Sequence, residues 1–154
     1  MTISLTRLAA LAAGLLCCGI AAYAATPAEI VAARQANFKQ MGKGMKAIRE
    51  QMISPTPSFD AIKAGANAMN EAAGKVDGYF PQGSGPQAGL KTGALPAIWE
   101  KNGEFKGDAA KLVKAVAAMR TAAASGNIDQ VKAQFMAVGG TCKECHQNFR
   151  ARDD

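Results

Sequence analysis

Apolar residues recur at helical spacing along most of the chain after residue 24. From residue 30 to residue 52 they return every three or four positions, which places them on one face of an α-helix. Thr26 and Glu29 have the spacing of a capping box at the start of this helix. Ser54 and Pro55 follow the last apolar residue, so we expect the helix to end there.

Three further segments repeat this pattern. They are residues 58–80, residues 96–125 with a break at 102–103, and residues 128–149. Residues 81–94 are rich in Pro and Gly, carry no apolar pattern, and predict a long loop. Four amphipathic helices with two short connections and one long one predict an all-α fold, an antiparallel four-helix bundle, as a single domain over residues 25–154.

Residues 1–24 have the features of a secretory signal peptide. Arg7 supplies the positive start, residues 8–20 form an apolar run, and residues 22–24 read Ala-Tyr-Ala, which predicts cleavage after residue 24. The run is short for a membrane span. A retained anchor and a lipoprotein signal, suggested by two cysteines in the run, are the alternatives. We expect export to the periplasm without stable membrane insertion.

Composition and charge narrow the possible functions. Of the 154 residues, 49% are hydrophobic but only 6% aromatic, a mixture that favours helices over a β-sandwich. The net charge of +6 falls to +5 without Arg7, and the lysines are scattered. We therefore expect no nucleic-acid binding, whereas docking to an acidic protein partner remains open.

The residues that carry chemistry lie together near the C-terminus. Cys142-Lys143-Glu144-Cys145-His146 is a C-x-x-C-H sequence, the attachment signal for c-type haem. Successive residues of a helix turn by about 100°, so both thiols and the imidazole point to one side. The thiols can then join the two vinyl groups of one porphyrin while the imidazole reaches the iron. Gly139 and Gly140 precede the motif and suggest a bulky group close to the backbone.

Three other sites could use the same residues. A zinc site needs about four ligands, and the chain after residue 24 has two cysteines and a single histidine. A redox-active cysteine pair of the thioredoxin type needs a βαβ setting that this pattern does not predict. A structural disulfide between Cys142 and Cys145 is the third alternative.

The chain resembles the cytochrome c prime family in three stretches. These are residues 142–150, Pro96-Ala97-Ile98-Trp99 followed by Phe105-Lys106, and Arg34-Gln35. The resemblance implies a four-helix bundle with one covalent haem c, held by Cys142 and Cys145 and bound at its iron by His146. It also implies a protein that is not an enzyme but binds NO or CO and cycles one electron with an unknown periplasmic redox partner.

The sixth position of the iron decides between two functions. In the family, the residue four positions after the Arg of the Arg-Gln pair points at the iron, and here that residue is Phe38. Phe has no lone pair, so the resemblance implies a five-coordinate, high-spin iron that Phe38 shields. Met41 or Met45 could instead bind the iron after a small shift of the first helix, which would give a low-spin electron carrier.

The resemblance implies further haem contacts. Arg34 and Gln35 would lie at the propionates, Arg150 at the proximal side, and Thr92 and Gly93 against the porphyrin. From the residues alone, Arg34 could equally be a basic residue at the seam edge and Arg150 a solvated residue at a helix end. Members of the family are usually homodimers through their first two helices, so we expect a homodimer.

Overall fold

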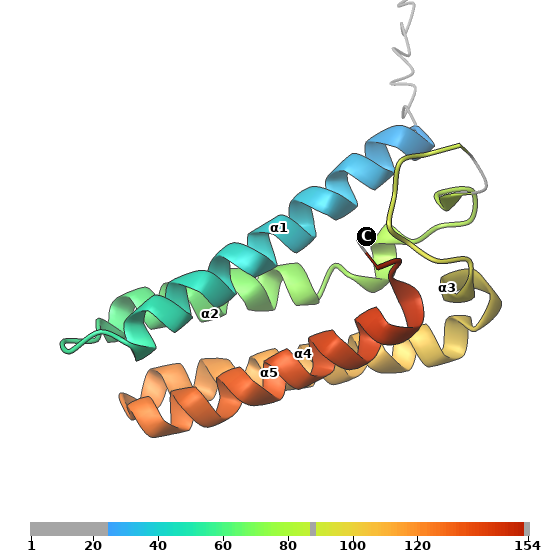
Figure 1. The fold of residues 1–154 in the computed structure, drawn as a ribbon. Coiled ribbons are helices and arrows are strands. Elements are labelled where there is room, and N and C mark those ends of the chain that lie inside the picture. Colours follow the sequence, from blue (N-terminus) through green and yellow to red (C-terminus); the bar gives the residue numbers. More distant parts are fainter. Residues whose placement is uncertain (1–24, 87–88, 153–154) are drawn as a thin grey trace, which may run out of the picture.

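The structure, a computed structural model, describes residues 25–86 and 89–152, so the predicted signal peptide lies outside the described residues. Its elements are α1 (Pro27–Met52), α2 (Phe59–Ala73), the 3-10 helix η1 (Asp77–Tyr79), α3 (Ala97–Glu100), α4 (Asn102–Ser125) and α5 (Ile128–Phe149). Figure 1 shows the four long helices as two antiparallel pairs, α1 with α2 and α4 with α5. The predicted four-helix bundle is confirmed. None of the described helices is both long and apolar enough to span a bilayer.

The first helix starts as its sequence predicts. The Thr26 hydroxyl accepts a hydrogen bond from the backbone N–H of Glu29, and the Glu29 carboxylate accepts one from the backbone N–H of Thr26 at 2.7 Å. This reciprocal pair satisfies N–H groups that a helix start otherwise leaves without partners. The hydrogen bonds from Thr26 also lower the pKa of Glu29, because they stabilise its ionised form.

The second helix is shorter than predicted. Ser58 caps it, but α2 ends at Ala73, and the chain then turns through η1 before it reaches Phe80. The prediction that this helix continues to Phe80 is therefore wrong. Val76 is nevertheless buried and Phe80 half-buried, because an apolar period reports which side chains are covered rather than which backbone groups bond to each other.

Three backbone features mark the boundaries of the third and fourth predicted helical segments. The break that we expected at residues 102–103 lies one residue earlier, at Lys101, which separates α3 from α4. Gly126 has φ of 70°, a left-handed conformation that ends α4 at little steric cost. The side chain of Asn127 accepts hydrogen bonds from two backbone N–H groups at the start of α5.

The core lies between the two helix pairs. α2 packs on α4, whereas α1 and α5 diverge from each other toward the end that carries the C-terminus and the long loop (Figure 1). Large side chains that are fully buried come from all four long helices and include Ile48, Ile62, Met69, Phe105, Met119 and Val138. The interfaces of α1 with α2, of α2 with α4 and of α4 with α5 are therefore closed. The interface of α1 with α5 opens at the end of the molecule where the C-x-x-C-H sequence lies.

Glycines allow α1 and α2 to approach closely. A Cβ atom at Gly44 would lie 2.5 Å from Cγ of Met69 and 2.9 Å from the carbonyl oxygen of Gly65. A Cβ atom at Gly65 would lie 3.2 Å from the carbonyl oxygen of Gly44. The two backbones touch at this crossing, so neither glycine has room for a larger residue.

Replacing Gly44 by Ala is expected to lower the free energy of unfolding by about 1–3 kcal/mol, because the new methyl group forces α1 away from α2. The matched control is Gly42→Ala on the same helix, where a Cβ would meet nothing within 4 Å. That change should stabilise the protein by up to about 1 kcal/mol through helix propensity. Urea denaturation followed by circular dichroism measures both, and equal effects would contradict the close crossing.

Candidate functional site

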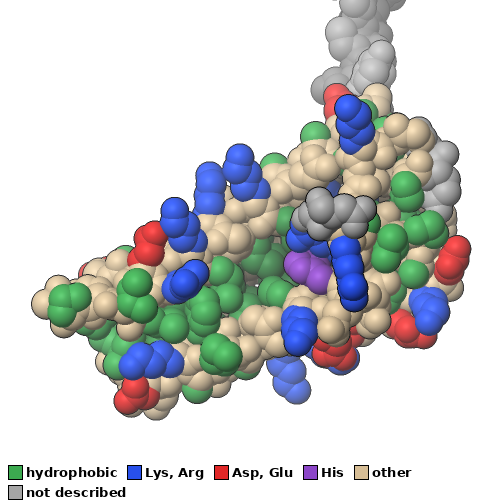
Figure 2. All heavy atoms as spheres, in the orientation of Figure 1, with side chains coloured by type: hydrophobic (Ala, Val, Ile, Leu, Met, Phe, Trp, Pro, Cys, Tyr) green, Lys and Arg blue, Asp and Glu red, His purple; other side chains and the backbone are tan. Residues whose placement is uncertain are grey.

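The C-x-x-C-H sequence lies on the last turns of α5 and faces the opening between the helix pairs. Cys142 and Cys145 are free thiols, both half-buried, and both pack against the hydrophobic core. His146 is exposed beside them. Figure 2 shows this single histidine in purple within a hollow of the surface, with hydrophobic side chains along the hollow and the helices of the two pairs on either side.

The surroundings set the protonation of these three side chains. Burial raises the pKa of the Cys142 thiol, and burial together with Asp108 raises that of Cys145 to about 11. Both therefore stay protonated thiols at neutral pH. Although His146 is exposed to solvent, nearby protein atoms partly desolvate its ring, and this desolvation, with a smaller effect from Arg150, lowers the pKa of His146. The neutral imidazole that this favours has the lone pair that binds a metal.

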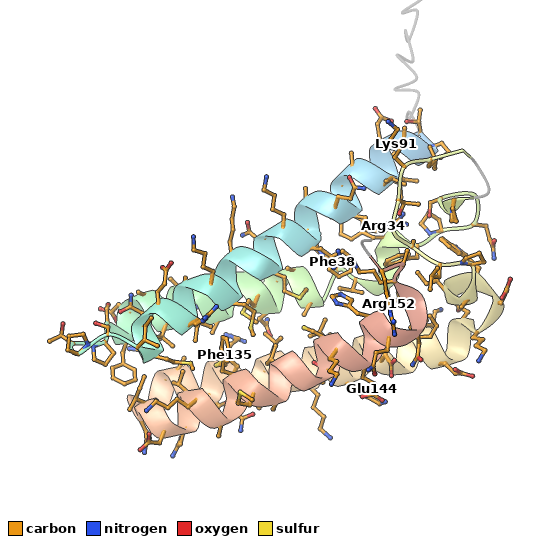
Figure 3. The ribbon with its side chains drawn as sticks, in the orientation of Figure 1. Arg34, Phe38, Lys91, Phe135, Glu144 and Arg152 are labelled. Atoms are coloured by element: carbon orange, nitrogen blue, oxygen red, sulfur yellow. The ribbon has the colours of Figure 1, made fainter. Side chains whose placement is uncertain are left out.

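Apolar side chains from α1 and α5 face the same opening. Figure 3 shows Phe38 on α1 and Phe135 on α5, both directed toward the space between the helix pairs. Both rings are half-buried and pack against the core. Met41 is 5% exposed and belongs to the core, and Met45 is half-buried against it. The α1 side chain that faces the site is thus that of Phe38, an aromatic ring without a lone pair.

These features fit a c-type haem. Two thiols and one imidazole lie on one helix beside an apolar opening, which is the donor set that a covalently bound porphyrin needs. A Cβ at Gly139 or Gly140 would meet nothing within 4 Å, so the backbone of α5 before the motif borders open space. In the part of the chain that the structure describes, no group of three His, Cys, Asp or Glu side chains could hold a metal ion directly.

A buried arginine closes one side of this opening. Arg34 is only 2% exposed, and burial lowers its pKa. Its Nη1 donates to the carbonyl oxygen of Tyr79 and to the Ser84 hydroxyl, both at 3.3 Å. Its Nη2 donates to the Ser84 carbonyl at 3.0 Å and to the Thr92 hydroxyl at 2.8 Å. The forked end of the guanidinium thus binds the long loop, and the predicted propionate contact of Arg34 stays a prediction.

The long loop also binds the next residue of α1 and the end of α5. Gln35 donates from Nε2 to the carbonyl oxygen of Lys91 at 3.2 Å. The backbone N–H of Ala151 donates to the carbonyl oxygen of Gly93 at 2.8 Å, and a Cβ at Gly93 would lie 3.8 Å from Cγ of Arg150. The structure thereby brings together the predicted haem contacts Arg34, Gln35, Thr92, Gly93 and Arg150 as one rim.

An ion-pair bridge holds the motif against α4. Lys111 on α4 donates to Asp108 at 2.9 Å and to Glu144 at 2.7 Å, and Glu144 lies between the two cysteines. The Asp108 side chain is only 11% exposed, so its carboxylate depends on Lys111 for compensation. Sequence reasoning missed this bridge. The three-residue spacing of Asp108 and Lys111 was the available signal.

Comparison with known proteins decides the family. The family model described as Cytochrome C' matches residues 29–150 of this chain. The chain belongs to the cytochrome c' family. The cytochrome c' of Pararhodospirillum photometricum is 35% identical over 127 residues, which cover 82% of this chain and 99% of that protein. The cytochrome c-556 of Agrobacterium fabrum is also 35% identical, over 96% of this chain and 95% of that protein.

Solved structures agree with this assignment. The cytochrome c' of Thermochromatium tepidum is 29% identical with a TM-score of 0.78, over 83% of this chain and 98% of that chain. A cytochrome c' with ligand-controlled dimer dissociation is 26% identical with a TM-score of 0.79, over 84% of this chain and all of that chain. Cytochromes c' bind one covalent haem c, so the predicted cofactor is confirmed.

Replacing Arg34 by Lys is expected to loosen the long loop, because one ammonium group cannot span Tyr79, Ser84 and Thr92. Buried carbonyl groups then lose partners at roughly 1–3 kcal/mol each. The backbone N–H groups of Leu95 and Ala151, which bond across to Phe149 and Gly93, should exchange with solvent at least about tenfold faster.

Hydrogen exchange measured by mass spectrometry tests this expectation. Arg49→Lys is the control, because Arg49 is an exposed arginine in the last turn of the same helix. Unchanged exchange in Arg34→Lys would show that the loop does not depend on the guanidinium.

Replacing Lys111 by Met is expected to lower the melting temperature at neutral pH, because Asp108 then loses its cation. Hydrogen bonding to Glu144 and Asp108 raises the pKa of Lys111, so the folded state keeps a proton that the unfolded state loses from about pH 10.5. The stabilisation is therefore complete below that pH and is lost as the pH rises above it.

Melting curves from pH 6 to pH 11.5 measure this difference between the wild type and Lys111→Met. The control Lys132→Met removes a pair with Asp129, which is 84% exposed, and should change little. A difference that does not shrink above pH 10.5 would mean that the Lys111 charge does not stabilise this end of the bundle.

Proposed function

We propose that this chain is an exported, periplasmic protein whose haem c iron is bound by His146 and is open to a small diatomic gas on the opposite side. Cys142 and Cys145 hold the haem through thioether bonds. The observation that carries the proposal is the position of Phe38. This ring without a lone pair lies four residues after the buried Arg34 and is directed into the opening between the helix pairs (Figure 3).

Each side chain has a defined task in this proposal. The iron supplies reversible binding of NO or CO and a one-electron change between its two oxidation states. The Cys142 and Cys145 thiols would hold the haem as two thioethers, because addition of each S–H across a vinyl group would need no oxidant. The lowered pKa of His146 favours the neutral ring that binds iron. Phe38 can neither give nor take a proton, which supports gas binding rather than enzymatic turnover.

The family supports gas binding as the function. Variants of the cytochrome c' of Alcaligenes xylosoxidans have been solved with carbon monoxide and with nitric oxide bound. They share the fold of this chain with TM-scores of 0.75. We infer the same ligand class here, with NO or CO as the gas and a periplasmic protein as the redox partner.

A second candidate is a low-spin electron carrier in which a methionine binds the iron. Met45 is half-buried on the same helix as Phe38 and favours this alternative. Met41 is 5% exposed within the core and would have to leave its packing to reach the iron. Burial of Met41 and the position of Phe38 both support the five-coordinate site instead.

We also propose a homodimer through the outer faces of α1 and α2. A groove of about 320 Å³ runs between these helices, with alanines such as Ala33, Ala36 and Ala68 along it and Gln40, Glu71, Lys75 and Tyr79 among its other lining residues. Small side chains let a second helix pair approach closely. One structurally similar cytochrome c' is a dimer whose dissociation is controlled by ligand.

Absorption and electron paramagnetic resonance spectra test the iron site. The purified protein is expected to show a high-spin ferric iron, and its ferrous form should bind carbon monoxide readily. Phe38→Met should shift the iron toward six-coordinate low spin, because the thioether supplies the lone pair that Phe38 lacks. Phe59→Met is the control, since Phe59 is a half-buried phenylalanine at the start of α2, away from the site.

Three results would contradict the proposal in different ways. Colourless protein without a covalent mass increase would exclude a bound haem. A low-spin ferric spectrum with a sulfur-to-iron band in the wild type would favour methionine ligation. An unchanged spectrum in Phe38→Met would place Phe38 away from the iron.

A further inference from the structure

Phe80 occupies an unusual place next to the site. It follows η1, at the start of the long loop, and its ring is half-buried against the core. Phe38 has one ring-to-ring contact among the described residues, and it is with Phe80, at 6.4 Å between centroids. The neighbour of the proposed distal ring therefore comes from the loop and not from a helix of the bundle.

The Phe80 ring is held on several sides. The Arg34 guanidinium carbon lies 4.5 Å from its centroid. Phe105 meets it edge-on at 4.7 Å, and Trp99 meets it edge-on at 6.2 Å. These contacts combine cation–π attraction with favoured aromatic geometry, so rotation of the Phe80 ring is opposed from each of these directions.

The backbone of Phe80 is fixed as well. Its carbonyl oxygen accepts a hydrogen bond from Nε1 of Trp99 at 3.0 Å. The preceding carbonyl, of Tyr79, accepts one from Arg34 at 3.3 Å. Arg34 thus holds both the ring and the chain next to it, and Arg34 stands one helical turn before Phe38.

We propose that Phe80 is a positioning residue that restricts the movement of Phe38 and thereby limits the rate at which a diatomic ligand reaches the iron. This inference rests on the proposed function, in which Phe38 covers the distal side. A ligand that enters needs the space of the Phe38 ring, so that ring has to turn or shift. Phe80 is held by Arg34, Trp99 and Phe105, and it opposes a shift of Phe38 toward the loop.

The test measures the rate constant for carbon monoxide association with the ferrous protein in four forms. They are the wild type, Phe38→Ala, Phe80→Leu and the double variant. Phe80→Leu removes the aromatic contact and is expected to raise the rate constant about three- to tenfold. In the Phe38→Ala background the same change should have no effect, because the ring on which Phe80 acts is absent.

The control is Phe59→Leu, the same substitution at a half-buried phenylalanine away from the site. It should leave the rate constant unchanged. Should Phe80→Leu fail to hold its haem, Phe80→Met supplies an unbranched, flexible side chain that adapts better to the space of the ring and gives the same readout. Urea denaturation of each variant separates a loss of stability from a change in ligand entry.

The outcomes separate this inference from the function on which it rests. Faster binding in Phe38→Ala with no change in Phe80→Leu, or an equal acceleration by Phe80→Leu in both backgrounds, overturns the role of Phe80 and leaves the open site intact. No change in Phe38→Ala, together with a low-spin iron in the wild type, overturns the proposed function itself.

Discussion

The buried guanidinium of Arg34 is the interaction on which this end of the molecule depends. A cation that is 2% exposed is tolerated only when acceptors surround it, so η1 must keep Tyr79 in place and the long loop must keep Ser84 and Thr92 in place. The same group stacks on Phe80. A loop without regular structure is thereby held in one position against α1.

The hydrogen bonds of the long loop continue to the end of α5. From Thr92 the chain runs to Gly93, which accepts a hydrogen bond from Ala151 just after the end of α5. An aromatic series crosses the interior by a second route, from Phe38 through Phe80 and Phe105 to Phe149. The helix that carries Phe38 and the helix that carries His146 are therefore connected through both the loop and the core.

The opening itself results from unequal helix packing. Gly44 and Gly65 let α1 and α2 touch, which leaves no room at that interface for a cofactor. The ring of Phe38 faces the space where α1 and α5 diverge (Figure 3), and Lys111 of α4 binds Glu144 of the cysteine motif. Close packing at three interfaces thus leaves the fourth, between α1 and α5, as the open one, and the C-x-x-C-H sequence lies there.

Local signals in the sequence determined where the first two helices begin and which residues can carry chemistry. The cap at Thr26, the cap at Ser58 and the C-x-x-C-H sequence each act within a few residues, so their meaning does not depend on distant parts of the chain. Apolar periodicity likewise identified which side chains are buried, including Val76 beyond the true end of α2.

Only the tertiary structure decided the end of α2 and the partners of Arg34, Phe80 and Lys111. The acceptors of Arg34 lie 45 to 58 residues further along the chain, and Glu144 lies 33 residues beyond Lys111. No local sequence pattern encodes contacts between residues this far apart in the chain. An arginine on the apolar face of a helix has the same local sequence context whether it binds a propionate or a loop. Which group it holds depends on where the fold brings the loop.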